Sequence, residues 1–344
     1  MFEMGISVYS GFTEYTKELN DSYMEKAGRL GYKLVFTSGH ISEASKNQDE
    51  FNSLLASAKK ANLKLMIDVS KPMMSLFKLD PAISTLRLDY GFSDEDIVNL
   101  SNSKDFSIQL NASTVSIDKL KKLISLGLNQ YNTSLCYNFY PKPYTGHDLS
   151  FVKERTSLFK NLGFKVIAFI PSFNGRRAPL YEGLPTVEAH RKQDLNLSIE
   201  ELKACSIDGI IFGDSYASIA ELELLKLHQT DDILIPTKLY SPIAEELFDI
   251  SYRIRPDYND TLLRVARPRV SDIVPFNTNV RLKYDLTMDN RLFGRYSGEV
   301  NIINKPLPED DRCNVIGHVD LSEILIDEIK KGKSFRFISK EQLC

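Results

Sequence analysis

Short apolar runs recur along the first part of the chain, and most are continuous rather than alternating with polar residues. Continuous runs of about 4 to 8 residues are typical of parallel strands that are covered on both faces. The pattern predicts eight strands, at 5–11, 33–39, 64–70, 85–91, 107–113, 130–139, 165–172 and 208–215.

Helical patterns lie between these runs. One helix is predicted from an apolar stripe at helical spacing, formed by Phe51, Leu54, Leu55 and Ala58. Three pairs of residues have the spacing of a helix capping box, namely Ser93 with Asp96, Ser198 with Glu201, and Ser218 with Glu221. Glycines in the phrases RLGYKLVF and NLGFKVIAF suit helix ends, where a left-handed residue closes the last turn.

Eight strand and helix alternations within about 230 residues match the size of an α/β TIM barrel, a (β/α)8 fold. The alternative is a doubly wound open sheet. That fold usually carries a glycine-rich phosphate loop after its first strand, and SVYSGFTEY has no GxGxxG pattern. We therefore expect a barrel domain at 1–232.

From about residue 233 the pattern changes to short strand-like runs separated by Pro, Asn, Asp and Gly. These runs are ILIPTKLYS, ISYRIRPDY, NVRLKYDLTMDNRLFGRYSGEVNII and SFRFIS, and only SEILIDEIKKG has a helical pattern. This texture predicts a small, mostly β domain at 233–344, of the kind that forms a small barrel.

Composition excludes several classes of function. The net charge of −3 and the interleaving of acids with bases argue against nucleic acid as a partner. No window approaches the roughly 18 apolar residues of a membrane span, and the N-terminus does not resemble a signal peptide, so we expect a cytoplasmic protein. Cys136, Cys205, Cys313 and Cys344 form no CxxC pair, which favours reduced thiols over a zinc site.

Polar residues at the carboxyl ends of the predicted strands are the first candidates for a site, because these ends form the active face of a TIM barrel. They are Tyr9, Ser10, Thr37, Ser38, His40, Asp68, Asp89, Asn111, Asn138, Tyr140, Asn174 and Asp214. Arg87 and Asp89 are two apart on one strand and should face the same side, inward in a barrel. The alternative role, stabilising the next helix, applies most to Asp68 and Asp214.

The segment PSFNGRRAPLYEGLPTVEAHR follows the seventh strand and is much longer than an ordinary connecting loop of about 2 to 6 residues. Its candidate residues are Arg176, Arg177, Glu182, Glu188, His190 and Arg191. The arginines suit phosphate or carboxylate groups, and the glutamates suit acid or base catalysis. The alternatives are ion pairs in a solvated loop and, for Glu188, the first turn of a helix.

The segment YNFYPKPYTGHDLS, after the sixth strand, combines tyrosines and prolines in a second long loop. Such a loop would present aromatic faces on which a sugar ring can stack, although Tyr and Pro also serve ordinary loop packing.

Other chemistries are poorly supported by the sequence. The five histidines show no HxH or HExxH spacing, so we expect no metal and no cofactor. No GxSxG or Walker pattern is present. Paired carboxylates favour glycoside hydrolysis. A lysine aldolase is the alternative, but no lysine stands out at a strand end.

Six motifs together resemble the bacterial 6-phospho-N-acetylmuramidase family of cell-wall recycling. They are NFYPKPYTG (138–146), LYEGLPTVEAHR (180–191), FGDSYAS (212–218), RPDYNDTLLR (255–264), DNRLFGRYSGE (289–299) and CNVIGHV (313–319). The resemblance implies a TIM barrel followed by a cyclophilin-like β domain. It also implies cytoplasmic cleavage of N-acetylmuramic acid 6-phosphate from N-acetylglucosamine, so the expected partner is a small phosphorylated amino-sugar disaccharide.

That substrate carries a phosphate and a lactyl carboxylate. The expected partners of these anions are Arg176, Arg177 and Arg191, with Arg295 of the second domain closing over the same face. A catalytic pair is expected among Asp89, Glu182, Glu188 and Asp214. The sequence leaves open a retaining, inverting or substrate-assisted mechanism. A phosphosugar-binding protein without turnover and a phosphosugar aldolase or isomerase are the competing hypotheses.

Overall fold

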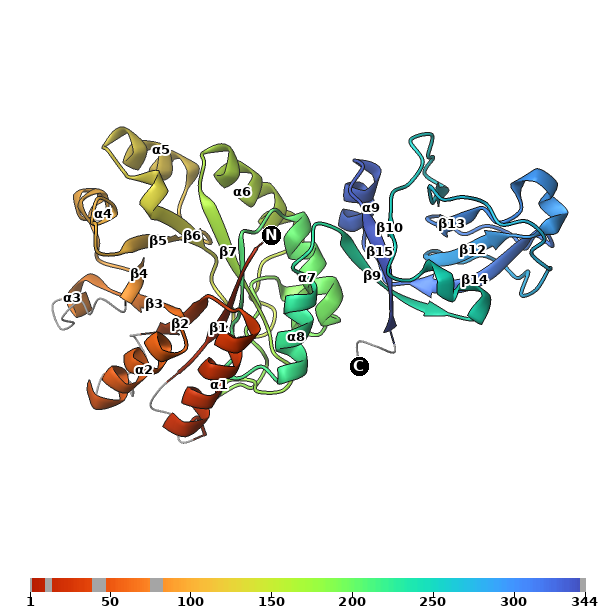
Figure 1. The fold of residues 1–344 in the computed structure, drawn as a ribbon. Helices are drawn as coiled ribbons and strands as arrows, with labels where there is room; N and C mark the ends of the chain where they lie inside the picture. The colour runs from red at the N-terminus through yellow and green to blue at the C-terminus, as the bar shows by residue number, and fades with distance from the viewer. Residues whose placement is uncertain (1, 10–13, 39–47, 75–82, 341–344) are drawn as a thin grey trace. The chain divides into compact units, whose positions relative to one another are not determined.

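Eight parallel strands close into a barrel in the first part of the computed structural model, with helices around the outside (Figure 1). The structure describes residues 2–9, 14–38, 48–74 and 83–340. The barrel strands are β1 Glu3–Ser7, β2 Leu34–Ser38, β3 Lys64–Val69, β4 Ile83–Leu88, β5 Ser107–Asn111, β6 Thr133–Cys136, β7 Lys165–Ile170 and β8 Gly209–Phe212. Pairing of β1 with β8 closes the barrel, which confirms the predicted TIM-like fold.

The helices that follow the strands are α1 Lys17–Leu30, α2 Gln48–Lys60, α3 Lys71–Met74, α4 Asp94–Ser101, α5 Ile117–Ser125, α6 Leu149–Asn161, α7 Leu195–Ala204 and α8 Ile219–Leu227. Two short 3-10 turns, η2 Gln130–Asn132 and η3 Glu188–Arg191, precede β6 and α7. The predicted stripe of α2 is confirmed for Leu54, Leu55 and Ala58, which are buried, and the side chain of Phe51 lies outside the described structure.

Two of the three predicted capping boxes are confirmed, at Ser93 before α4 and at Ser218 before α8. The third prediction was wrong. Asp194 caps α7 by accepting hydrogen bonds from the backbone of the first turn, and Ser198 lies inside that helix. The aspartate lies four residues nearer the N-terminus and takes the capping position, which leaves Glu201 for a different partner.

The barrel interior is apolar on one side. A cluster of buried side chains from β2, β3, β6, β7 and β8, with one residue that follows β1, consists of Tyr9, Leu34, Phe36, Met66, Cys136, Ile167, Phe169 and Ile211. Phe139, which follows β6, packs on this cluster and makes edge contacts with Phe36 and Phe169. The cluster therefore runs through the barrel interior, from Leu34, Met66 and Ile167 near the amino ends of the strands to Tyr9 below their carboxyl ends.

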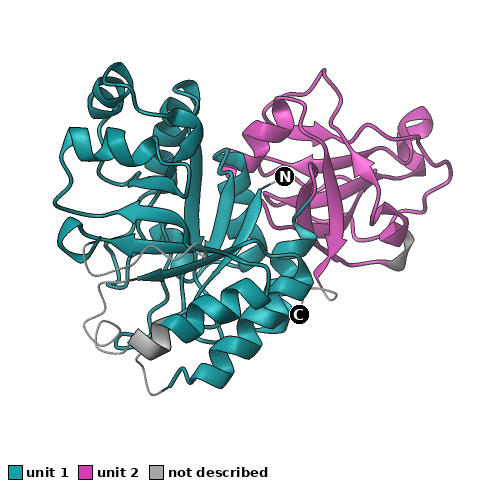
Figure 2. Ribbon diagram, turned by 60° about the vertical axis from the view of Figure 1, so that its left-hand side comes forward, with its two compact units in different colours: residues 1–229 teal, residues 230–344 magenta. Residues whose placement is uncertain are grey.

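The chain divides into two compact units, residues 1–229 and 230–344 (Figure 2). The second unit contains β9 Ile233–Leu239, β10 Ser251–Tyr252, β11 Leu262–Arg264, β12 Asp285–Asp289, β13 Val300–Ile303, β14 Cys313–Val319 and β15 Phe335–Ser339. They form one sheet in the order β10-β15-β9-β14-β12-β13-β11. With α9 Glu323–Lys330 and the 3-10 turns η4 Pro242–Leu247 and η5 Arg291–Tyr296, this is the predicted mostly β domain.

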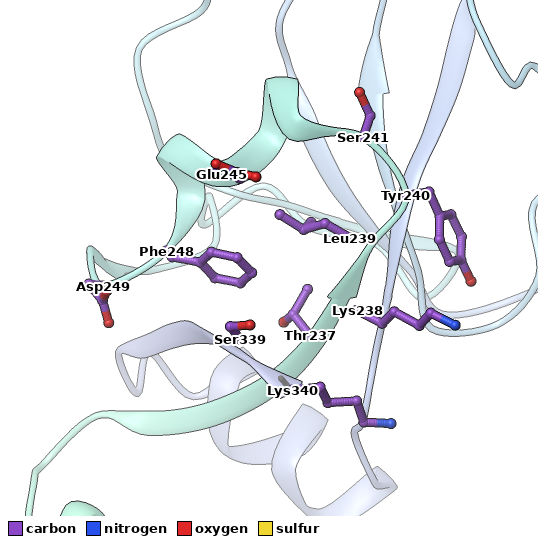
Figure 3. A pocket seen from close by; sticks show the side chains of 10 residues that line it. All are labelled: Thr237, Lys238, Leu239, Tyr240, Ser241, Glu245, Phe248, Asp249, Ser339 and Lys340. Carbon is purple, nitrogen blue, oxygen red and sulfur yellow. The ribbon is translucent and has the colours of Figure 1, made fainter. Parts of the chain in front are cut away.

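A pocket of about 620 Å³ lies in the second unit, between β9, η4 and the end of β15 (Figure 3). Figure 3 shows the ammonium groups of Lys238 and Lys340 directed away from the carboxylates of Glu245 and Asp249. The pocket is therefore lined by charges of both signs. Within the described ranges, no helix is long and apolar enough to cross a membrane.

Candidate active site

The loops after β6 and β7 meet above the barrel through backbone hydrogen bonds. Tyr140 N donates to Pro185 O at 3.0 Å, and His147 N donates to Thr186 O at 2.9 Å. The Thr186 hydroxyl also donates to the carbonyl of Asn138 at 2.9 Å. The two segments singled out in the sequence therefore form one wall of the barrel mouth.

Asp214, just after β8, holds the β7 loop through three backbone groups. Its carboxylate accepts hydrogen bonds from Ser172 N at 2.9 Å, Arg177 N at 3.0 Å and Leu184 N at 3.1 Å. Burial raises the pKa of Asp214, and the three N–H donors oppose that rise. Because the side chain is fully buried and its oxygens face the loop backbone, Asp214 positions the loop.

Glu188 is held by a second set of donors. The two N–H groups of Arg191 reach its two oxygens at 2.7 Å each, and Tyr144 N and Gly146 N donate at 2.8 Å. The pKa of Glu188 falls to about 2, mainly because of the hydrogen bonds from Arg191. A carboxyl that acidic is ionised at neutral pH, so Glu188 is a poor proton donor and serves as a clamp between the two loops.

Two of the three predicted anion-binding arginines are used to build the loop. Arg191 is buried and donates to the carbonyls of Gly183 at 2.8 Å and Tyr140 at 2.9 Å in addition to binding Glu188. Arg176 donates to the carbonyls of Ser172 at 3.3 Å and Arg191 at 3.2 Å.

Arg177 lies over the barrel mouth. Its guanidinium carbon is 4.6 Å from the centroid of the Tyr9 ring and 5.1 Å from that of Phe139. The Tyr9 hydroxyl donates to Gly213 O at 2.8 Å, which fixes this ring across the β1–β8 junction. Stacking on aromatic faces leaves the edge of a guanidinium available to an anion. Arg177 is therefore the arginine whose geometry suits a ligand best.

A polar cluster lies at the ends of β3, β4 and β6. Arg87 is buried, and its guanidinium donates to Asp68 Oδ1 at 2.8 Å and to Asn138 Oδ1 at 2.5 Å. Asp68 and Arg87 are register partners on adjacent strands, so the ion pair follows from the barrel topology. The inward direction that the sequence predicted for Arg87 is confirmed.

Two other carboxylates lie at this face. Asp89 directly follows β4 and is exposed. Glu182 is half-buried beside a pocket of about 400 Å³ that Tyr144, Glu188, Arg191 and Lys192 also line. In the part of the chain that the structure describes, no hydrogen bond or ion pair is made by the Glu182 carboxyl.

Of the other predicted site residues, most make hydrogen bonds within the barrel loops and helices. Asn111 accepts a hydrogen bond from Ser113 N at 3.0 Å in a local turn, and Asn174 donates to Ser218 Oγ at 3.2 Å. Ser38 ends β2 at the barrel mouth. His190 is fully buried, and its Nε2 lies 2.9 Å from Glu201 on α7, so it fastens the loop to that helix.

Three predicted residues do not belong to the described part of the barrel. Arg295 belongs to η5 of the second unit, where it donates to the hydroxyl of Tyr296 at 2.7 Å. Ser10 and His40 lie outside the described residues.

The sequence did not single out Phe139 or His147 as contributors to the mouth, and it did not reveal the partners of Tyr9 and Arg87. Tyr9 and Phe139 support Arg177, and Arg87 fixes Asp68. His147 lies 2.9 Å from the Tyr140 hydroxyl and 3.0 Å from the Ser113 hydroxyl, and burial lowers its pKa. The charge of Arg87 within an apolar strand was the available signal, because a buried guanidinium requires a partner. Among the described residues, no cluster of His, Cys, Asp or Glu could hold a metal ion.

Comparison with known proteins places this site in a family. Models of the N-terminal and C-terminal parts of 6-phospho-N-acetylmuramidase match residues 4–227 and 233–338. The TIM-like barrel thus forms part of a glycosidase, and the chain belongs to the 6-phospho-N-acetylmuramidase family. The substrate of that family is a phosphorylated muramyl sugar, which implies a role in peptidoglycan recycling.

Two solved structures resemble the whole chain. A conserved protein of unknown function from Enterococcus faecalis is 28% identical, with a TM-score of 0.75, over 99% of this chain and 97% of that one. An uncharacterized B. cereus protein is 26% identical, with a TM-score of 0.85, over 98% of this chain and 100% of that one. A search of curated proteins finds no match.

Proposed function

We propose that this chain hydrolyses the glycosidic bond between N-acetylmuramic acid 6-phosphate and N-acetylglucosamine at the carboxyl ends of the barrel strands. The observation that carries the assignment of this face is the position of Arg177, whose guanidinium is supported by Tyr9 and Phe139 over the mouth. A planar fork held in this way suits a phosphate, and the family's substrate is phosphorylated.

Arg177 binds the 6-phosphate in this proposal, while the other loop residues hold Arg177 in place. Asp214 fixes the Arg177 backbone, and Glu188 with Arg191 ties the β7 loop to the β6 loop. Preorganisation of this kind reduces the entropy that binding must overcome. Asp68 and Asn138, which Arg87 orients, are assigned to the hydroxyl and acetamido groups of the sugar.

Asp89 and Glu182 are the proposed acid and base. Asp214 is buried against three N–H groups, and Glu188 is ionised by Arg191, so neither suits proton transfer to the leaving oxygen. Asp89 and Glu182 come from the β4 and β7 sides of the mouth and are both accessible. One protonates the oxygen of the leaving sugar, and the other acts on the anomeric carbon directly or through water.

The test is incubation of the purified protein with the phosphorylated disaccharide, with products identified by mass and the first-formed anomer by NMR. Release of the two monosaccharides supports hydrolysis. Retention of the anomeric configuration corresponds to a covalent or substrate-assisted route, and inversion to direct attack by water. Tight binding of the disaccharide without cleavage would instead identify a phosphosugar-binding protein.

A further inference from the structure

The opposite end of the barrel contains a polar pocket that the proposed reaction does not use. Its volume is about 530 Å³, and it is lined by the first residues of several barrel strands, including Glu3, Lys64, Ser107, Thr133 and Lys165. It therefore opens at the amino ends of the strands, whereas the candidate active site lies at their carboxyl ends. The volume falls within the range of about 300 to 1,000 Å³ that is typical of small-molecule sites.

One wall of this pocket consists of inward-facing polar side chains. Thr85 and Ser107 are register partners whose hydroxyls lie 2.9 Å apart, and Gln109 donates to its register partner Ser134 at 3.1 Å. The interior of a TIM barrel is usually filled by bulky branched apolar residues. In this chain β4, β5 and β6 present hydroxyl and amide groups instead.

Gln109 is the informative member of that wall. Its side chain is fully buried, and its amide nitrogen is used by Ser134, but its carbonyl oxygen has no hydrogen-bond partner within the described structure. Gln109 lines the pocket. A buried carbonyl without a donor is costly, because it has lost its hydration without replacement. Gln109 consequently brings an acceptor without a partner to the wall of the pocket.

The rim adds an aromatic platform and balanced charge. Tyr131, in η2 just before β6, lines the pocket and is fully exposed to solvent. The lining contains two negative charges, from Glu3 and Asp208, and two positive charges, from Lys64 and Lys165. Asp208 also forms an ion pair with Lys160, whose Nζ lies 2.6 Å from Asp208 Oδ1. Charge balance favours a neutral ligand, and an exposed ring beside hydroxyls and amides favours one with both an apolar face and many hydroxyls.

We infer that this pocket is a second binding site, which takes a neutral, hydroxyl-rich ring of monosaccharide size. Its ring stacks on Tyr131, and a hydroxyl donates to the Gln109 carbonyl. This site is separate from the proposed active face, and its failure would leave the proposed hydrolysis untouched.

Met66 provides a local reporter, because it lines the pocket and is one of only seven methionines in the chain. The protein, labelled with ¹³C at the methionine methyl groups, is titrated with N-acetylglucosamine, and the Met66 resonance is assigned with Met66→Leu. We expect a saturable shift of this resonance. Tyr131→Ala should weaken the interaction at least fivefold, and Tyr131→Phe, which keeps the ring, should retain it.

Two further variants separate this site from the active face. Asn138→Ala, which removes a proposed sugar contact at the active face, should leave the Met66 titration unchanged, and Gln109→Leu should weaken it. Tyr131→Ala should hydrolyse the phosphorylated disaccharide at the wild-type rate. A Met66 resonance that does not move up to the solubility limit of the sugar, or a titration that Tyr131→Ala leaves unchanged, would overturn the inference.

Discussion

The guanidinium of Arg177 lies 4.6 Å from the centre of the Tyr9 ring, so a residue of the β7 loop is supported by the end of β1. Asp214, at the end of β8, fixes the backbone of the same arginine. The position of Arg177 thus depends on three strands of the barrel. The β7 loop is therefore already ordered by these contacts, so binding does not have to overcome the conformational entropy of ordering it.

Replacement of Arg177 should reduce recognition of the phosphate. Hydrogen bonds to a charged group contribute about 1.5 to 3 kcal/mol, which corresponds to about 10- to 100-fold in kcat/KM. Arg177→Ala should show this loss mainly in KM, and Arg177→Lys should recover only part of it because lysine lacks the planar fork. Kinetics on the unphosphorylated disaccharide provide the control, since a loss of equal size there would contradict phosphate binding by Arg177.

Glu188→Gln should destabilise the protein in a pH-dependent manner. The pKa of Glu188 in the folded protein is about 2, below its ordinary value of 4.5, so its ionised form stabilises the fold above pH 4.5. That contribution is lost as the pH falls through about 2. Urea unfolding at neutral pH should show a loss of about 3 kcal/mol, and the difference from wild type should shrink below pH 4.5.

Glu182→Gln is the matched control for this experiment, because Glu182 lies in the same loop and makes no ion pair within the described residues. We expect it to change the unfolding free energy by less than about 0.5 kcal/mol at any pH. A loss for Glu188→Gln that is equally large at pH 7 and pH 3 would show that the charge of Glu188 is not what stabilises the loops.

Asp214→Asn should mainly reduce stability, whereas Asp89→Asn should mainly reduce turnover. Asparagine at 214 replaces an acceptor oxygen by an amide nitrogen that faces backbone N–H groups, so we expect a loss of about 3 kcal/mol in unfolding free energy. Asp89 is exposed, so Asp89→Asn should leave stability within about 0.5 kcal/mol of wild type. Its kcat should fall about 100-fold or more if it transfers a proton. Near wild-type turnover of Asp89→Asn would remove it from the proposed pair.

Arg87 and Asp68 should be energetically coupled. Removal of one partner from a buried ion pair costs about 3 to 5 kcal/mol, because the other charge is left buried without compensation. Arg87→Met and Asp68→Asn should each be strongly destabilising, and the double variant should lose less than the sum of the two. Urea unfolding of the four proteins measures the coupling, and additive losses would mean that the pair does not act as a unit.

The strands were predictable because parallel barrel strands are covered on both faces and therefore have continuous apolar runs. The loops after β6 and β7 were recognisable by their length and composition. In the second unit, β11 and β14 were not identified as strands. Leu262–Arg264 is only three residues long, and Cys313–Val319 interrupts its apolar residues with Asn, Gly and His.

The roles of individual site residues depend on contacts that sequence spacing does not encode. Asp214 and Glu188 are carboxylates at positions typical of catalytic acids. In the structure, however, backbone N–H groups donate hydrogen bonds to Asp214, and Arg191 donates to Glu188. The path of the β7 loop determines these contacts. The capping of α7 likewise was not determined by sequence spacing alone, because Asp194 occupies the capping position that the spacing assigned to Ser198.

Cleavage that depends on phosphate recognition by Arg177 is tested most directly by incubating the 6-phosphorylated muramyl disaccharide and its unphosphorylated form with the wild-type protein and with Arg177→Ala. We predict cleavage of the phosphorylated compound by the wild type, little cleavage of the unphosphorylated one, and loss of that preference in Arg177→Ala. Equal cleavage of both compounds by the wild type, or cleavage of neither, would contradict this prediction.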